Sequence, residues 1–145
     1  MLDGTPEFAA ARWTLGLAEL ERGRHEEAID HLRQTVRLTA ENPARLAELG
    51  YAYGRAGRAE DAARVLAQLE GLAHRRRVSS ADLALVELGL GHRDAALDLL
   101  DKAYSERSCL FLNMRLDPRL DSLRGEPRFQ RLLARLRWPA GPGRG

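Results

Sequence analysis

The sequence is poor in the residues on which several classes of protein depend. It contains one cysteine, Cys109, so no disulfide can form within the chain, which fits a reducing compartment. The first residues, MLDGTPEF, lack the basic and apolar regions of a secretory signal, and every apolar run is far shorter than the roughly 18 residues of a membrane-spanning helix. We therefore expect a cytoplasmic protein that does not insert into a membrane.

Motifs that would carry chemistry are also scarce. His25 and His31 are six residues apart, which places them on different faces of a helix, whereas paired metal ligands lie at i and i+4. Cys109 lies in the apolar run CLFLNMRL, where a thiol is more often a small hydrophobe than a nucleophile. The sequence contains no GK[ST] motif, which a phosphate-binding loop would require. We therefore expect a protein that is not an enzyme, with no catalytic residue, no cofactor and no metal.

Lysine is almost absent, and the charge is unevenly distributed. Lys102 is the single lysine among 23 basic residues, and the formal net charge of the whole chain is +2. Residues 115–145 hold eight arginines against three acidic residues, a balance of +5, which leaves −3 for residues 1–114. This split is weak support for an acidic partner.

Two groups of arginines stand out within this distribution. Either group could touch phosphates, but exposed aromatic residues do not alternate with them as they do in single-strand binders, so solvated surfaces are favoured and nucleic acid is not expected. The first group is a run between two repeats and the second is a stripe at i, i+3 and i+7: Arg75, Arg76 and Arg77, then Arg128, Arg131 and Arg135.

The dominant feature that is present is a repeat. The phrases GRHEEAIDHL, GRAEDAARVL and GHRDAALDLL begin at Gly23, Gly57 and Gly91, so both intervals are 34 residues. Apolar and small residues step by four and three after each glycine, which predicts a helix, and a second apolar pattern precedes each glycine. The pattern therefore predicts two helices in each unit. The glycine is expected to end the first helix in the left-handed conformation, and Pro43 to begin the next pair.

Small residues recur where the two helices of a unit must approach each other. A very short turn brings antiparallel helices too close for large side chains near their crossing. We expect the small residue of each first helix to face the alanine of its second helix, which pairs Gly16 with Ala28, Gly50 with Ala62 and Ala84 with Ala96.

The repeat resembles the tetratricopeptide repeat (TPR), whose units have this period and this Leu-Gly, Tyr, Ala pattern. The second unit matches best, with Leu46, Leu49, Gly50, Tyr53, Gly57, Ala62 and Leu66. The resemblance implies an all-α fold, an α-solenoid of three TPR helix-turn-helix repeats with a C-terminal closing helical segment. The expected parts are a lead-in (1–8), an array over 9–110 with repeats at about 9–42, 43–76 and 77–110, a capping segment (111–138) and a disordered tail (139–145).

The predicted capping segment has its own pattern. Phe129, Leu132, Leu133 and Leu136 fall at i, i+3, i+4 and i+7, which predicts an amphipathic helix covering the last repeat. The stretch DPRLDSLRGEPRFQRLLARL is similar to the tail of many bacterial TPR proteins, in which the array follows a kinase, cyclase or DNA-binding domain. This resemblance leaves open that the chain is a relative of the C-terminal region of a multidomain signalling or regulatory protein.

The resemblance also implies a binding groove, which the first helices of the units line. The residues expected in that groove are Trp13, Leu17, Tyr51, Arg55, Asp82 and Leu85. This surface is apolar and suits an amphipathic helix or an extended apolar peptide. The alternative is that Trp13 and Leu17 pack against a preceding repeat or against the termini of the chain itself.

These observations favour a non-catalytic scaffold for protein–protein interaction that binds a peptide or helix in the groove. The alternative is a regulatory or sensor domain of a signalling or transcription-regulating protein, which contacts an acidic partner or nucleic acid through the C-terminal arginine stripe. That alternative predicts steeply salt-dependent binding. Homo-oligomerisation through the exposed ends of the solenoid also stays open.

Overall fold

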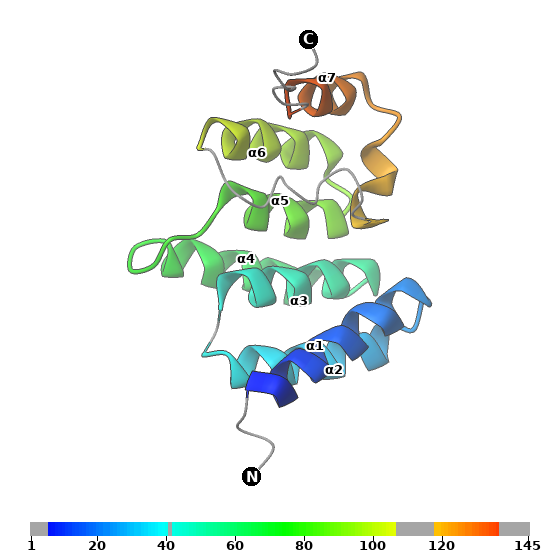
Figure 1. Cartoon of the computed structure of the whole chain (residues 1–145), viewed down its shortest axis with the longest axis vertical. Helices are drawn as coiled ribbons and strands as arrows, with labels where there is room; N and C mark the ends of the chain where they lie inside the picture. The colour runs from blue at the N-terminus through cyan, green and yellow to red at the C-terminus, as the bar shows by residue number, and fades with distance from the viewer. Residues whose placement is uncertain (1–5, 41, 107–117, 137–145) are drawn as a thin grey trace, which may run out of the picture.

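A computed structural model of the chain describes residues 6–40, 42–106 and 118–136, which are helical apart from the connections between helices (Figure 1). Three helical pairs stack along the long axis, with α7 at the far end from the first pair. The helices are α1 (Pro6–Glu21), α2 (His25–Leu38), α3 (Pro43–Arg55), α4 (Ala59–Leu72), α5 (Ser80–Gly89), α6 (Arg93–Ser105), the 3-10 helix η3 (Pro118–Leu123) and α7 (Pro127–Leu136). The prediction of an all-α solenoid of three helical pairs is confirmed.

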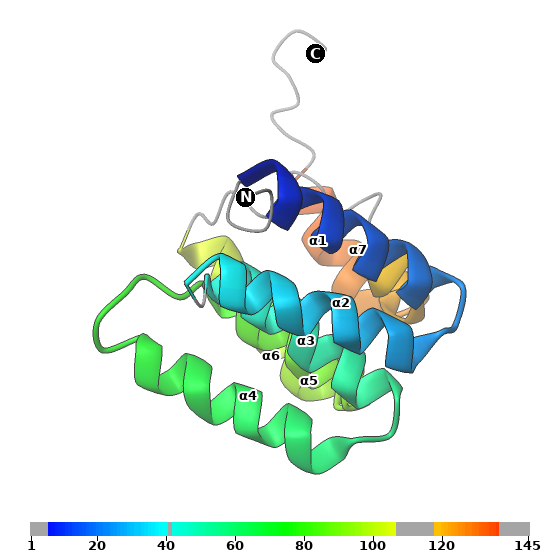
Figure 2. The same ribbon diagram turned by 90° about the horizontal axis from the view of Figure 1, so that it is seen from below.

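The apolar core lies largely between the pairs, as expected for a solenoid. One buried cluster joins α2, α3 and α4 to Val86 of α5, and a second joins α5 and α6 to η3 and α7. Viewed from below, α4 lies on the opposite side of the array from α1 and α7 (Figure 2). Because each cluster includes residues from neighbouring pairs, every pair depends on the next for burial of its apolar surface.

Local signals set the turns as the sequence predicts. Gly23, Gly57 and Gly91 have φ values of +80°, +80° and +87°, the left-handed conformation that ends a helix without strain at glycine. The Asn42 side chain accepts a hydrogen bond from the Ala44 backbone N–H, with proline in the first turn of α3. Each pair is therefore a tight helical hairpin.

The nearest side chains to Gly16 and Gly50 across the helix contacts belong to larger residues. A Cβ atom added to Gly16 would lie 2.8 Å from Cγ of Leu32, and one added to Gly50 would lie 2.8 Å from methyl groups of Val65 and Val86. Leu32 follows Ala28 by one helical turn on the same face. The glycines thus make room for long side chains near the predicted alanines, and the alanines themselves are fully buried.

Two glycines mark a close backbone contact between α3 and α5, which the sequence analysis did not identify. A Cβ on Gly54 would lie 2.4 Å from the carbonyl carbon of Gly89, and a Cβ on Gly89 would lie 2.6 Å from the carbonyl oxygen of Tyr51. Only glycine allows this backbone contact. It brings the first helices of the second and third pairs directly together.

The closing segment covers the last pair. Phe129 and Leu132 of α7 are buried, which confirms the predicted amphipathic helix, and η3 buries Leu120 and Leu123 in the same cluster. The first helix begins at Pro6, inside the predicted lead-in, and the unit boundaries stay predictions. Cys109 and the tail 139–145 lie outside the described residues. Across the described helices, none combines the length and apolar character needed to cross a membrane.

Candidate partner-binding groove

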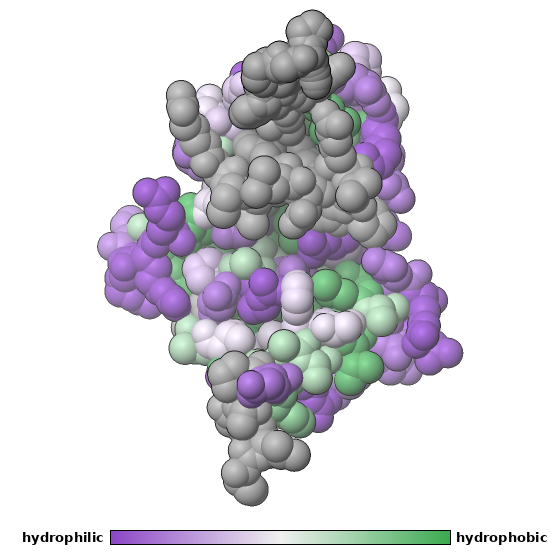
Figure 3. Space-filling view, in the orientation of Figure 1, coloured by the Kyte–Doolittle hydropathy of each residue, from purple (hydrophilic) through white to green (hydrophobic). Residues whose placement is uncertain are grey.

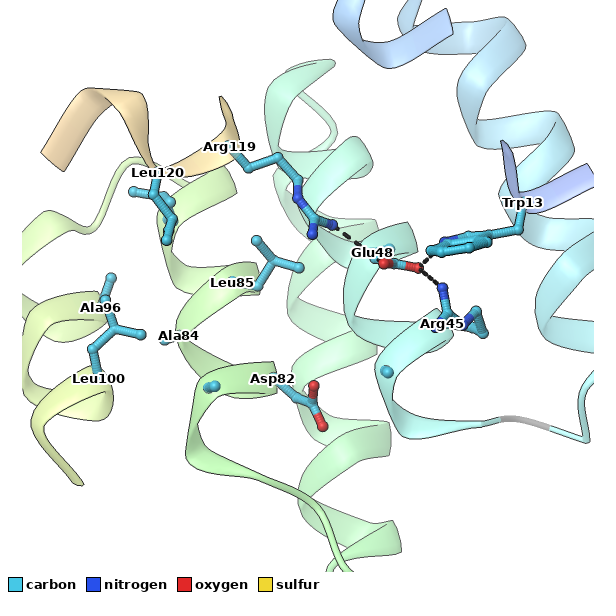
Figure 4. Close-up of a pocket in the computed structure, with 13 residues that line it drawn as sticks. Trp13, Arg45, Glu48, Asp82, Ala84, Leu85, Ala96, Leu100, Arg119 and Leu120 are labelled. Atoms are coloured by element: carbon cyan, nitrogen blue, oxygen red, sulfur yellow. Dashed lines mark hydrogen bonds and ion pairs between the residues drawn. The ribbon is translucent and has the colours of Figure 1, made fainter. Parts of the chain in front are cut away.

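A cavity of about 220 Å³ opens on the side of the array that carries the first helices. Its wall comes from α1, α3 and α5, with further contributions from α6 and η3 (Figure 4). The residues that determine its chemistry are Trp13, Arg45, Glu48, Asp82, Leu85, Leu88, Leu100, Arg119 and Leu120. The cavity therefore combines an aromatic ring, two arginines and two carboxylates with an aliphatic floor.

Glu48 is the centre of a hydrogen-bonded network in this wall. One carboxylate oxygen accepts from Nε1 of Trp13 at 2.7 Å and from Nη1 of Arg45 at 2.9 Å, and the other accepts from Nη1 of Arg119 at 3.3 Å. The Arg45 guanidinium also lies 4.0 Å from the centre of the Trp13 ring, a cation–π contact. Although Glu48 is only 6% exposed, three donors compensate its charge and tie α1, α3 and η3 together.

Asp82 is the second buried carboxylate, at 7% exposed. The pKa of its carboxyl is raised from 3.8 to about 6: burial is the main cause and the charge of Glu48 adds to it, while a hydrogen bond from the Ser79 backbone and the charge of Arg45 act in the opposite direction. The Ser79 hydroxyl in turn accepts from the Ala81 N–H, which caps α5. Desolvation outweighs this local stabilisation, so Asp82 is a carboxylate with an incompletely compensated charge.

The two carboxylates occupy the same place in successive repeats, since 48 plus 34 is 82. The donors that serve Glu48 have no counterpart at Asp82. One period after Trp13 stands Ala47, and one period after Arg45 stands Ser79. Among the described residues, no ion pair joins Asp82 to a cation.

Three of the six residues predicted for the groove line the cavity, namely Trp13, Asp82 and Leu85. Tyr51 does not: it is 7% exposed and belongs to the buried cluster that includes residues of η3, so it offers little surface to a partner. Leu17 is half-buried on α1 and Arg55 is exposed at the end of α3, and neither is part of the wall. Contact of Tyr51, Leu17 and Arg55 with a partner stays a prediction, and their positions outside the cavity wall do not support it.

Sequence reasoning missed Arg45, Glu48 and Arg119. A signal existed for Glu48, because the repeat register aligns it with Asp82 and both are acidic positions on the first helices of their units. No local signal marks Arg119, because only the packing of η3 against α5 and α6 brings it to the cavity. The C-terminal segment thus supplies part of the groove wall.

The arginine stripe of α7 is largely engaged within the chain. Arg128 donates to Asp98 at 2.8 Å and to Asp101 at 2.9 Å. Arg135 lies 4.2 Å from the centre of the Tyr104 ring and 3.9 Å from Asp101, while Arg131 is exposed. The turn between α4 and α5, with its three arginines, forms a hydrophilic lobe at one edge (Figure 3). Acidic residues of α6 therefore already neutralise much of the stripe.

The described residues include no cluster of three or more histidine, cysteine or acidic side chains that could hold a metal ion. Residues 16–57 match a protein-family model described as a TPR repeat. The match runs from Gly16 in α1 through α2 and α3 to Gly57. The comparison with curated proteins and the comparison with solved structures each found no match.

Proposed function

We propose that this chain, part of which matches the tetratricopeptide repeat, is a non-catalytic module that binds a peptide or helical segment of a partner in the cavity. The repeats of that family generally mediate protein–protein interaction. The observation that carries this proposal is the composition of the cavity wall. An aliphatic floor formed by Leu85, Leu88 and Leu100 lies beside a few fixed polar groups, the arrangement typical of a recognition site.

The polar groups are held in place before any partner arrives. Trp13 and Arg45 stack on each other and both donate to Glu48, so their side chains are ordered by contacts within the chain. Ordering in advance lowers the entropic cost of binding. The position of the site on the first helices also agrees with an elongated ligand that runs across several repeats.

The alternative is a regulatory domain that contacts nucleic acid or an acidic partner through α7. The contacts of Arg128 with Asp98 and Asp101 weigh against it, because a phosphate would have to compete with carboxylates already in place. We therefore favour the cavity. A cytoplasmic location, and a place within a larger signalling system, belong to this proposal.

Panning a random dodecapeptide display library against the purified chain tests the proposal. The dissociation constant of the most enriched peptide is then measured by fluorescence anisotropy with two variants of one helix. Leu85→Ala removes part of the cavity wall, and Leu83→Ala makes the same change on α5 at a residue outside that wall. We expect about tenfold weaker binding for the first and less than about twofold for the second. Absence of enrichment, or equal effects of the two variants, would contradict the proposal.

A further inference from the structure

We propose that the cavity selects partner peptides that carry an arginine next to aliphatic residues, with Asp82 as the group that binds the guanidinium. This inference rests on the proposed function and names the class of partner. The cavity places Asp82 beside Leu85, and Leu88 and Leu100 line the same space. A cation and its aliphatic neighbours would therefore meet a carboxylate and an apolar surface in one site.

The comparison of the two equivalent carboxylates is the first argument. Glu48 receives an indole N–H from the preceding repeat, a guanidinium from its own helix and a second guanidinium from η3. At the corresponding places around Asp82 the chain has Ala47 and Ser79, which supply neither an indole nor a guanidinium. The repeat therefore builds the same acidic position twice, and among the described residues an indole or guanidinium donor serves only the first of the two.

The second argument comes from the chain itself. Arg119 of η3 reaches the Glu48 carboxylate, and the next residue, Leu120, is buried and lines the cavity (Figure 4). An arginine followed by a leucine is thus a combination that this wall already accommodates. A partner that presents the same pair to Asp82 would repeat, one period further along, the contact that η3 makes with Glu48.

Charge balance is the third argument. Both arginines of the wall, Arg45 and Arg119, donate to Glu48. The negative charge of Asp82 is opposed by no ion pair among the residues that the structure describes, and Glu48 lies near enough to raise its pKa. An acidic ligand would meet two carboxylates, and a wholly apolar ligand would cover an incompletely compensated charge. A guanidinium provides the missing charge and can donate two parallel hydrogen bonds to one carboxylate.

The cavity is large enough for such a side chain. Its volume of about 220 Å³ is many times the roughly 10–15 Å³ that a cavity needs, on the same measure, to hold one water molecule. Small residues, Ala44, Ala81 and Ala84, form part of the wall and leave this space open. A long side chain can therefore reach Asp82 without displacing η3.

The test pans the dodecapeptide library in parallel against the wild type, Asp82→Asn and Asp30→Asn. Asp82→Asn keeps the shape of the side chain and removes its charge, whereas Asp30→Asn removes the same charge from an exposed residue of α2. We expect the wild type and Asp30→Asn to enrich peptides with an arginine flanked by leucine, isoleucine or phenylalanine, and Asp82→Asn to lose that preference. Replacing the arginine of the best peptide by citrulline should weaken wild-type binding about tenfold. The same replacement should leave binding to Asp82→Asn unchanged.

Each remaining outcome has a separate meaning. Enriched peptides without a basic residue, or an arginine preference that Asp82→Asn retains, would overturn this inference and leave the proposed function standing if Leu85→Ala still weakens binding. If lysine is enriched as often as arginine, and neutralising either side chain weakens binding equally, the preference for a guanidinium is overturned. A library that yields no enriched peptide on any of the three proteins would overturn both the inference and the proposed function.

Discussion

At the scale of single residues, two carboxylates at equivalent repeat positions have opposite energetic roles. Glu48 accepts hydrogen bonds from three donors, so its charge is compensated and it stabilises the junction of α1, α3 and η3. Asp82 is equally buried, and desolvation dominates the environment of its charge. The same substitution, a carboxylate replaced by its amide, should therefore change stability in opposite directions at the two sites.

Asp82→Asn should stabilise the protein, and the gain should depend on pH. The pKa of Asp82 is about 6 when folded and 3.8 as a reference, so the folded state holds the proton more tightly and wild-type stability falls as pH rises through this window. At 1.36 kcal/mol per unit, the gain is about 3 kcal/mol at pH 8 and below about 1 kcal/mol at pH 4. Urea unfolding at both pH values measures it, with Asp30→Asn as the exposed control. A loss of stability at pH 8 would contradict the account.

Glu48→Gln should destabilise the protein at neutral pH. The amide keeps one acceptor oxygen but removes the buried negative charge that Arg45 and Arg119 contact. We expect a loss of about 2–4 kcal/mol in the free energy of unfolding. Glu60→Gln, an exposed position of α4, is the control and should change it by less than about 0.5 kcal/mol. Equal stabilities of the two variants would mean that the network of Glu48 contributes nothing.

At the scale of helices, the contact between α3 and α5 sets the spacing of the second and third pairs. Neither glycine of this contact can take a side chain, because the atoms that a Cβ would meet belong to the backbone of the facing helix. Backbone atoms of a packed helix cannot move aside as the end of a flexible side chain can. The contact also places Asp82 and Leu85 of α5 opposite Arg45 and Glu48 of α3 in the cavity wall (Figure 4).

Gly54→Ala should therefore destabilise the array although alanine favours helices. A Cβ there would lie 2.4 Å from the Gly89 carbonyl carbon, so the pairs must separate, and we expect a loss of at least about 2 kcal/mol. Gly71→Ala is the matched control, since it is also helical but meets no atom within 4 Å, and it should gain up to about 1 kcal/mol. Thermal melts followed by circular dichroism compare them. A Gly54→Ala variant as stable as Gly71→Ala would refute the close contact.

The helices and their turns could be predicted from the sequence because their causes are local. Gly23, Gly57 and Gly91 carry the left-handed conformation themselves, and Asn42 caps the helix that directly follows it. The cavity could be predicted only in part. Trp13, Asp82 and Leu85 were found through the repeat register, whereas the burial of Tyr51 and the position of Arg119 result from contacts between distant segments. Such contacts leave no periodic pattern in the sequence.

At the scale of the whole molecule, the array of stacked pairs has two sides that differ in what they expose. The first helices and η3 enclose the cavity, while α4 lies on the opposite side of the array from α1 (Figure 2). Acidic residues of α6 form ion pairs with Arg128 and Arg135 of α7. The central claim is therefore that a partner enters at the cavity and at neither α4 nor α7.

Amide hydrogen exchange, with and without a saturating enriched peptide, tests this claim most directly. Binding slows exchange everywhere to the extent that it stabilises the folded state, so the informative signal is protection beyond that uniform effect. The account predicts such protection in α3 and α5, whose residues line the cavity, and none in α4. Protection confined to α4 or α7, with α3 and α5 showing only the uniform slowing, would contradict it.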